Sequence, residues 1–277
     1  RRGRGDRRGA GAGRARAMSA DLVLSAVDRQ RIAAIVQLDD VGALVAHLEE
    51  PSWAVRRAVV SAVAHRGDAA VGALLAALRA RGSEVRLAAA VDTLVALKGT
   101  PEPSIVAAAA GAEPALRCDL AQVLGRRRHA PSAPLLAAWV ADPDDNVAVA
   151  AIEALGRIGG EAGLEAVTAA AKSGSFFRTF PAIDVLSRSS DPRVLPPLAG
   201  LLGDPLCGPE AARALGRRGE ADAVVPLAGL LAGPQRGDAM VRIAAVALVE
   251  VASRQRDRFG GDAVAQAVRD LVSADAA

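Results

Sequence analysis

Residues 142–159 read DPDDNVAVAAIEALGRIG, and this stretch decides the fold because it encodes one turn followed by one helix. Its first four residues, Asp142-Pro143-Asp144-Asp145, are of the types that form turns and cap helix N-termini. The apolar residues that follow recur at helical spacing and predict one buried stripe, made of Val147, Ala150, Ala151, Ala154, Leu155 and Ile158. Gly156 falls inside this helix, and Gly159 is placed to end it.

A second, shorter helix is predicted just before this one, over Ala133–Ala141 (APLLAAWVA). Pro134 stands in its first turn, where a missing backbone N–H costs little. Two helices of this size cannot bury both of their faces against each other alone. The pair therefore needs a similar pair on each side, and copies of it are expected elsewhere in the sequence.

The rest of the chain contains such copies. The apolar residue near the end of the second helix, which is Leu155 in the opening stretch, recurs at steps of 32, 29, 31, 31, 29 and 33 residues. We call these positions the landmark residues: Val63, Val95, Leu124, Leu155, Leu186, Leu215 and Leu248. The next residue is small at six of the seven positions. This period predicts a helical solenoid, in which stacked helix pairs form one continuous core.

Short motifs also recur within the predicted second helices. They are Val55-Arg56-Arg57-Ala58, Leu116-Arg117 and the endings VLGRRR, ALGRIG and ALGRRG. These motifs resemble HEAT repeats, and the most similar variety is the short bacterial repeat of the phycobilisome-lyase type, over roughly Val41 to Arg256. The resemblance implies an all-α fold, an α-solenoid (α-α superhelix) of about seven HEAT-like helix pairs with helical caps. It implies no single function, because scaffolds, adaptors, lyases and DNA-repair enzymes share such repeats.

The resemblance also implies an arginine seven residues before each landmark residue, where it makes polar contacts between neighbouring repeats. Arg56 and Arg117 occupy this position, but the other repeats have other residues there. Arg86, Arg178 and Arg242 lie nearby and are candidates to replace it in a shifted register.

The chain is expected to have four parts. Residues 1–17 (RRGRGDRRGAGAGRARA) have no apolar periodicity and predict a disordered Arg/Gly-rich tail. Residues 18–40 predict an N-terminal capping helix, and residues 41–256 the repeat array. Residues 257–277 contain the amphipathic run DAVAQAVRDLVS and predict a C-terminal capping helix, since terminal repeats need an atypical outer face.

The tail carries the excess positive charge. It holds seven of the 34 Lys and Arg residues and one of the 31 Asp and Glu residues, so the formal net charge changes from +3 to −3 without it. Two interpretations stay open. The tail is either a basic arm that seeks RNA or a membrane, or sequence upstream of a natural start at Met18 and therefore not native.

No segment predicts secretion or a membrane span. Charged residues interrupt the first apolar run, and no run reaches the roughly 18 apolar residues of a membrane helix. Cys118 and Cys207 lie in different repeats, too far apart to pair, which favours a reducing compartment. Neither these residues nor the three histidines show metal-ligand spacing. We therefore expect a cytoplasmic bacterial protein without a catalytic constellation, a metal site or a cofactor.

A basic residue follows most landmark residues closely, and together these residues predict a cationic ridge along one edge of the stack. The ridge consists of Arg66, Lys98, Arg126, Arg127, Arg128, Arg157, Arg188, Arg217 and Arg218. Such a ridge can hold an acidic protein or a phosphate backbone. The alternative is that these cations only complement the macrodipoles at helix C-termini, at about 0.3–1 kcal/mol each.

A second row, two residues before the landmarks, is expected on the open face of the second helices. This open-face row consists of Ser61, Thr93, Gln122, Glu153, Asp184, Arg213 and Val246. It has no net positive charge and no aromatic ring, which argues against nucleic acid as the partner.

The two tryptophans have different expected roles. Trp139 stands where other first helices have leucine and is expected in the core. Trp53 begins a second helix, at a position that is usually polar in such repeats, and is a candidate contact for a partner protein.

The fifth repeat, SGSFFRTFPAIDVL, departs most from the others and holds three of the four phenylalanines. Because proline costs about 3 kcal/mol inside a helix, we expect the second helix to begin late, with Pro181 in its first turn and residues 175–179 as an irregular loop. Phe176, Phe177 and Arg178 are then candidates for partner binding. The alternative is that the rings fold inward and fill the gap left by the lost turn.

From these observations we expect a monomeric, non-enzymatic scaffold or adaptor that binds another protein, with an acidic partner favoured by the ridge. One alternative is a phycobilin-lyase-like or chaperone-like role, in which a chromophore or a client helix lies on the concave face. Nucleic-acid binding is a third hypothesis.

Overall fold

The computed structural model of the protein describes residues 24–231 and 238–259. Within these ranges the regular elements are all helices and no strand occurs, so the predicted all-α fold is confirmed. The chain divides into two compact units, residues 1–108 and residues 109–277, and each unit is described by itself. The predicted tail over 1–17 and the predicted helix DAVAQAVRDLVS lie outside the described residues.

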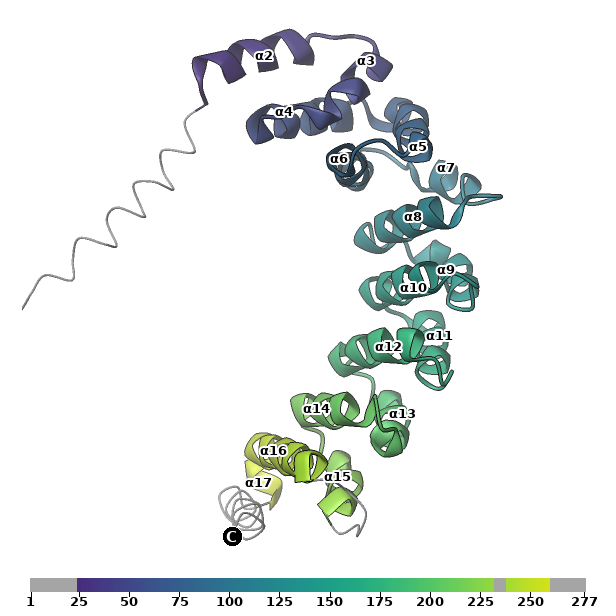
Figure 1. The fold of residues 1–277 in the computed structure, drawn as a ribbon, viewed down its shortest axis with the longest axis vertical. Helices are drawn as coiled ribbons and strands as arrows, with labels where there is room; N and C mark the ends of the chain where they lie inside the picture. The colour runs from purple at the N-terminus through teal and green to yellow at the C-terminus, as the bar shows by residue number, and fades with distance from the viewer. Residues whose placement is uncertain (1–23, 232–237, 260–277) are drawn as a thin grey trace, which may run out of the picture. The chain divides into compact units, whose positions relative to one another are not determined.

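Unit 1 begins with α2 (Ala26–Val36), inside the segment expected to hold the N-terminal cap. The helices that come first in each predicted pair are α3 (Val41–Ala46) with the 3-10 turn η1 (His47–Glu49), α5 (Val71–Ala80) after η2 (Gly67–Ala70), and α7 (Glu102–Ala107). The second helices are α4 (Trp53–His65) and α6 (Glu84–Ala96). Helix α2 packs on α4, and α4 packs on α6 (Figure 1).

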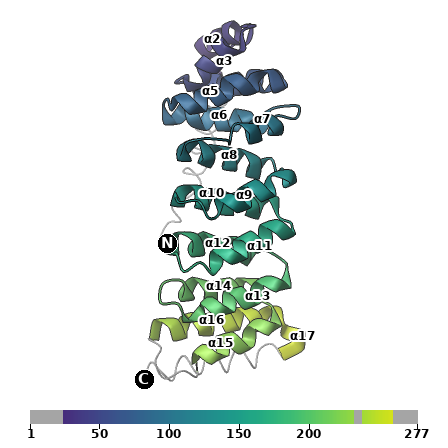
Figure 2. The same cartoon turned by 90° about the vertical axis from the view of Figure 1, so that its right-hand side faces the viewer.

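Unit 2 continues the same pattern. Its second helices are α8 (Pro114–Arg126), α10 (Asp145–Ile158), α12 (Phe176–Arg188), α14 (Gly208–Arg218) and α16 (Asp238–Arg254), followed by the short α17 (Arg256–Phe259). Its first helices are α9 (Ala133–Trp139) after η3 (Ala130–Ser132), α11 (Glu161–Ala171), α13 (Leu195–Gly200) between η4 (Pro192–Val194) and η5 (Leu201–Gly203), and α15 (Val224–Leu231) after η6 (Ala221–Ala223). Within unit 2 the second helices pack on one another in chain order and form one layer, and the first helices form the other (Figures 1 and 2).

Helix α10 forms as its sequence predicts. The side chain of Asp144 accepts hydrogen bonds from the backbone N–H groups of Asn146, at 2.9 Å, and Val147, at 3.3 Å, which satisfies two donors of the first turn. Gly159 ends the helix with a φ of 74°, a conformation that residues with a Cβ rarely adopt. The buried stripe is slightly rotated from the predicted one, since Ile152 is fully buried and Ala150 only half-buried.

The landmark residues are buried in six of the seven repeats. The exception is Val95 of α6, which is half-buried while its neighbour Leu94 is completely buried. One residue turns a helix face by about 100°, so α6 faces the core one residue earlier than predicted. The same rotation buries Thr93, whose hydroxyl donates to the carbonyl of Ala89 at 2.6 Å. The prediction that Thr93 lies on the open face is wrong for this reason.

The small residue after the landmark lets successive second helices of unit 2 approach closely. A Cβ on Gly125 of α8 would lie 2.6 Å from the Cα of Ala154 in α10. A Cβ on Gly216 of α14 would lie 2.8 Å from the Cα of Ala247 in α16. Because a Cβ does not come that close to backbone atoms in real structures, glycine is required at these positions for the observed packing.

Helix α12 corrects the prediction for the fifth repeat. The helix begins at Phe176, and Pro181 lies inside it rather than in its first turn. Residues 176–179 are therefore helical, not an irregular loop. Two contacts hold the early start: the buried Thr179 donates its hydroxyl to the carbonyl of Ala171 at 3.3 Å, and Ile183 is completely buried one turn later. Burial of this face offsets the cost of the proline.

Replacing Pro181 with alanine is therefore expected to raise the free energy of unfolding, by about 1–3 kcal/mol. Alanine restores a backbone N–H opposite the carbonyl of Phe177 and removes the steric clash of the proline ring with that carbonyl. Urea denaturation followed by circular dichroism measures the change. A midpoint at lower urea than wild type would show that the proline ring itself stabilises α12.

The prediction for Trp139 is confirmed. Trp139 lies at the end of α9 with 8% of its surface exposed, inside the core of unit 2.

Candidate functional site

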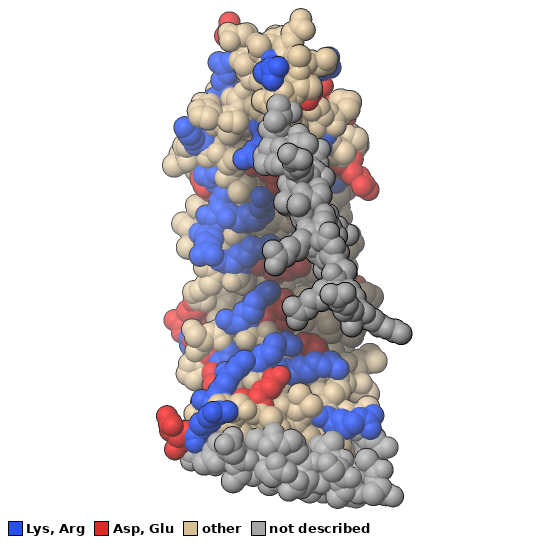
Figure 3. Space-filling view, turned by 90° about the vertical axis from the view of Figure 1, so that its left-hand side faces the viewer, with Lys and Arg blue, Asp and Glu red and all other residues tan. Residues whose placement is uncertain are grey.

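The open face of the second helices in unit 2 is the main candidate surface. Of the predicted open-face row, Gln122, Asp184, Arg213 and Val246 are exposed and Glu153 is half-buried. Two residues after four of the five landmarks of unit 2, a second exposed row consists of Arg126, Arg157, Arg188 and Arg217. Figure 3 looks onto this face, where Lys and Arg side chains follow one another over unit 2 with Asp and Glu side chains among them.

Three exposed arginines of this second row, Arg157, Arg188 and Arg217, are paired with acids of their own helices. Arg157 contacts Glu153 at 3.3 Å, and Arg188 contacts Asp184 at 2.7 Å. In α14 the acid lies further back, and Arg217 contacts Glu210 at 2.8 Å. These pairs reduce the net positive charge of the predicted ridge.

Arg218 and Arg66 do not belong to an exposed ridge. The side chain of Arg218 is only 3% exposed. It donates to the backbone carbonyls of Leu186, Ser189 and Asp191 at the C-terminal end of α12, and it pairs with Glu220. Arg66 likewise donates to the carbonyl of Leu38, at 2.7 Å, just after α2.

The prediction of Arg66 and Arg218 as ridge residues is therefore wrong. Both follow their landmark residue by three positions, and this position points toward the preceding helix pair. Arg126, Arg157, Arg188 and Arg217, which are exposed, follow the landmark by two positions. Adjacent helical residues point about 100° apart, so only one residue of each basic pair can face outward.

The three arginines at the C-terminal end of α8 also differ in exposure. Arg126 is the last residue of α8 and is exposed, while Arg127 is half-buried. Arg128 is exposed and has a φ of 52°, so it occupies the left-handed position that ends many helices. The backbone N–H of Arg128 donates to the carbonyl of Gly125, and that of His129 donates to Leu124.

Arg178 links two repeats and is not a free contact residue. Its guanidinium donates to the backbone carbonyl of Asp142 at 2.8 Å and lies 3.8 Å from the carboxylate of Asp145. Arg117 of α8 reaches the same aspartate from the other side, with 3.1 Å between its guanidinium and the carboxylate of Asp142. The two arginines thus hold the turn before α10 between α8 and α12. The expectation that Arg178 substitutes for the repeat arginine agrees with this contact.

An exposed aromatic cluster lies on α12, and it consists of Phe176, Phe177 and Phe180. Phe177 is 60% exposed, and the other two rings are exposed over more than two fifths of their surface. The ring centroids of Phe176 and Phe177 are 5.9 Å apart, and those of Phe176 and Phe180 are 5.5 Å apart. The rings do not fill a gap in the core, so the alternative of inward packing is wrong.

A small pocket of about 160 Å³ opens beside the aromatic cluster. Phe176 lines it from α12, and Leu206 lines it from the turn before α14. Leu206 is 68% exposed, and the carboxylate of Asp204 holds its turn by accepting the backbone N–H groups of Leu206 and Cys207 at 2.8 and 2.7 Å. The sequence analysis missed Leu206 and gave Phe180 no role. An apolar residue inside the turn Asp204-Pro205-Leu206 was the available signal.

Trp53, the candidate in unit 1, is also on the surface. Its side chain is 61% exposed at the start of α4. The guanidinium of Arg57, one turn later, lies 5.3 Å from the centre of its ring, a distance typical of a cation–π contact.

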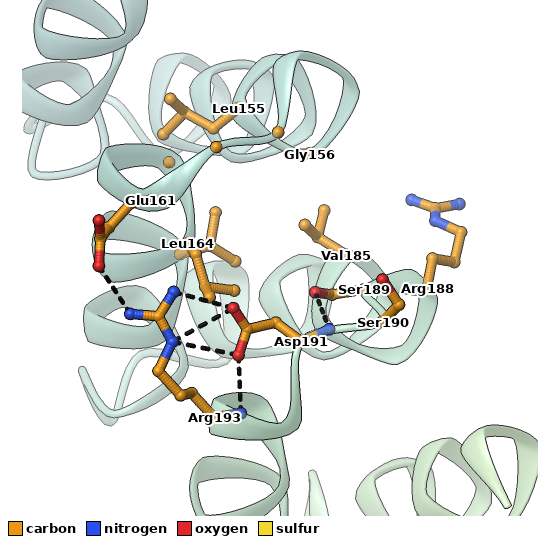
Figure 4. Close-up of a pocket in the computed structure, with 14 residues that line it drawn as sticks. Leu155, Gly156, Glu161, Leu164, Val185, Arg188, Ser189, Ser190, Asp191 and Arg193 are labelled. Carbon is orange, nitrogen blue, oxygen red and sulfur yellow. Dashed lines mark hydrogen bonds and ion pairs between the residues drawn. The ribbon is translucent and has the colours of Figure 1, made fainter.

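A cavity of about 510 Å³ lies between the end of α10, the start of α11 and the end of α12 (Figure 4). Arg193 crosses it and contacts Glu161 at 2.7 Å and Asp191 at 2.8 Å. The hydrogen bond from Arg193 lowers the pKa of Asp191, and Asp191 in turn raises the pKa of Arg193. The carboxylate of Asp191 is thus held in its charged form by a structural contact, which does not suit a general acid.

The two cysteines are free thiols. Burial raises the pKa of Cys118 and that of Cys207, and the carboxylates of Asp144 and Asp204 add to the effect. A raised pKa keeps a thiol protonated at neutral pH, so neither side chain is activated as a nucleophile. Among the residues that the structure describes, no group of three or more His, Cys, Asp or Glu side chains is arranged to hold a metal ion.

No single helix in the described ranges is both long and apolar enough to cross a membrane. Helix α4 and the segment Gly67–Ala80 reach the required length and composition only when taken together, across a bend of 118°.

The helix pairs define the protein as an α-solenoid, and comparison with known proteins finds a family of repeats that matches part of the chain. Residues 102–179 match the family model for HEAT repeats. The family match supports the predicted HEAT resemblance over these residues and does not extend to the phycobilisome-lyase variety. The comparison with curated proteins finds no match.

Several solved structures are similar. YibA of Escherichia coli aligns with a TM-score of 0.48 and 14% identity, over 91% of this chain and 98% of YibA. Human deoxyhypusine hydroxylase in complex with glycerol aligns with a TM-score of 0.35 and 18% identity, over 89% and 97% of the two chains. An engineered protein aligns with a TM-score of 0.39 and 21% identity, over 87% and 73%.

Proposed function

We propose that this chain is a non-enzymatic scaffold that binds another protein through the second helices of unit 2. The observation that carries the proposal is the exposed aromatic cluster of Phe176, Phe177 and Phe180, because large exposed rings are enriched in the cores of protein interfaces. The rings lie on a helix rather than on a loop, so they are held in place before a partner arrives. Such preorganisation lowers the entropy that binding costs.

The pocket beside the cluster supports the same proposal. It offers about 160 Å³ between Phe176 and Leu206, enough for one aliphatic side chain of a partner. An apolar anchor in a pocket, surrounded by exposed rings, is the usual form of an interface hot spot. The free thiols of Cys118 and Cys207 fit the reducing conditions of a cytoplasm, where we place the protein.

Replacing Phe176 and Phe177 together with serine is expected to weaken partner binding by more than ~2 kcal/mol, which is about 30-fold in affinity. The partner is first obtained by affinity capture with cross-linking from a native extract, and its affinity for each variant is then measured by calorimetry. The melting temperature should change little, because both rings are already exposed in the folded protein.

The matched control is Val225→Ser. Val225 is 78% exposed on α15, in the layer of first helices, and its replacement should leave capture unchanged. Equal capture by the double variant and wild type would overturn the proposal. A melting temperature lowered by about ten degrees or more would assign the rings to packing instead. A new absorption band on mixing the purified protein with a tetrapyrrole would favour the lyase-like alternative.

A further inference from the structure

A groove of about 500 Å³ runs between α14 and α16 on the open face of unit 2. Arg213 and Arg217 line it from α14, and Arg242 and Glu250 line it from α16. Between these charged residues the lining is aliphatic and includes Ile243 and Val246. Of these residues, only Arg217 was a predicted contact for a partner. Arg213 and Val246 were expected on the open face, and Arg242 was a candidate repeat arginine.

The groove carries more positive than negative charge. Arg213 and Arg217 share one acid, Glu210, at 3.2 and 2.8 Å. Glu250 lies beside Gly216. Arg242 is exposed and lines the groove from α16. Three arginines therefore line the groove beside one carboxylate, that of Glu250, and Glu210 pairs with two of these arginines.

The aliphatic part of the groove is open to solvent. Val246 is 60% exposed, although it lies on a helix whose other face packs into the core. An exposed aliphatic strip between arginines combines two recognition modes. The strip gains free energy when an apolar side chain covers it, and the guanidinium groups offer charged donors to carboxylates on either side.

We propose that this groove binds an acidic segment of a partner protein. An aliphatic side chain of the segment covers Val246 and Ile243, and its carboxylates pair with Arg242 and Arg213. This inference rests on the proposed scaffold function and adds the chemistry of the partner. Peptide suits the groove better than nucleic acid, because Glu210 and Glu250 repel phosphates and no aromatic ring lines the groove for base stacking.

The test is fluorescence anisotropy with two labelled probes and the full chain. One probe is a short amphipathic peptide of Glu, Leu and Ser, and the other has Gln in place of every Glu. The acidic probe should bind wild type at least tenfold more tightly than the Gln probe, and added salt should weaken its binding. Arg213→Gln and Arg242→Gln should each weaken binding of the acidic probe at least tenfold.

Two matched variants separate the groove from the rest of the face. Arg188→Gln removes an exposed arginine of α12 that pairs with Asp184, and it should leave the affinity unchanged. Val246→Ser should weaken binding, whereas Val225→Ser on α15 should not. Melting curves of the five variants should match wild type, because exposed charges and exposed aliphatic groups contribute little to stability.

Each result decides the proposal. Equal affinity for the two probes, no binding of the acidic probe, or unchanged binding by Arg213→Gln and Arg242→Gln would overturn it. Binding of a single-stranded DNA oligonucleotide in place of the acidic probe would overturn it in favour of nucleic acid. If the groove fails but the Phe176 and Phe177 variant still loses its partner, the scaffold function stands and only the acidic groove is withdrawn.

Discussion

Replacing Gly125 with valine is expected to lower the free energy of unfolding by about 3 kcal/mol. This would be a large effect for a substitution that changes no charge. A Cβ at this position would lie 2.6 Å from the Cα and 2.7 Å from the Cβ of Ala154. The nearest atom belongs to the backbone, so it cannot move aside as a flexible side chain would. Helices α8 and α10 would have to separate, and the buried contacts of Leu124 and Leu155 would loosen with them.

The matched control is Gly229→Ala, also a glycine within a helix of unit 2. Nothing lies within 4 Å of a Cβ built on Gly229, so alanine there should raise stability by up to about 1 kcal/mol through helix propensity alone. Gly125→Ala should lie between the two, because the steric cost exceeds the gain in propensity. Urea denaturation curves rank the three variants. A Gly125→Val variant as stable as wild type would show that the helices can separate at no cost.

Replacing Arg218 with alanine is expected to lower the free energy of unfolding by about 2–4 kcal/mol. The buried guanidinium donates to three backbone carbonyls, those of Leu186, Ser189 and Asp191, at and just beyond the C-terminal end of α12. It also pairs with Glu220, which is partly exposed and can be rehydrated. Alanine removes these three hydrogen bonds from a charged donor and opens a gap between α12 and α14.

Arg217→Ala is the control for this prediction. Arg217 is the neighbouring residue, exposed and paired with Glu210, and its loss should cost under about 1 kcal/mol. Thermal melts of the two variants, checked by denaturant curves, give the comparison. Equal stability of the two would mean that water replaces the guanidinium between α12 and α14. In that case Arg218 would contribute nothing measurable to the free energy of unfolding.

These two expectations follow from the same property of the stack. In unit 2, second helices that follow one another in the chain pack together, and Gly125 and Gly216 allow close approach to Ala154 and Ala247. A residue of one repeat also donates to the helix C-terminus of the repeat before it. Gln255 provides a second example, since its side chain donates to the carbonyl of Gly219 at 2.9 Å.

The cationic ridge shows why a repeat pattern alone does not define a binding surface. The repeat pattern places a basic residue shortly after most landmark residues. In α14, however, Arg217 faces solvent and Arg218 faces the preceding helix pair. The two residues are chemically identical and adjacent. Only the rotation of the packed helix about its axis decides that Arg217 is available to a partner and that Arg218 makes a buried structural contact.

The aromatic cluster makes the same point in another way. Composition alone marked the fifth repeat as unusual, because three of four phenylalanines are there. Local propensity then placed Pro181 in the first turn of the helix, and this was wrong. Tertiary packing of Thr179 and Ile183 extends the helix through the proline, and the extension turns Phe176, Phe177 and Phe180 to the surface together.

The sequence by itself determined the helix pairs, their order and the buried landmark residues, because apolar periodicity and helix caps act over a few residues and repeat along the chain. The tertiary structure decided the rotation of each helix, and with it the burial of Thr93, the inward direction of Arg218 and the exposure of Leu206. It also brought Arg213 and Arg242 to one groove from helices some thirty residues apart in sequence. The rotation of each helix about its axis depends on close contacts with its neighbours, such as that of Gly125 with Ala154. These contacts involve residues of several helices, so the residues of one helix do not determine them.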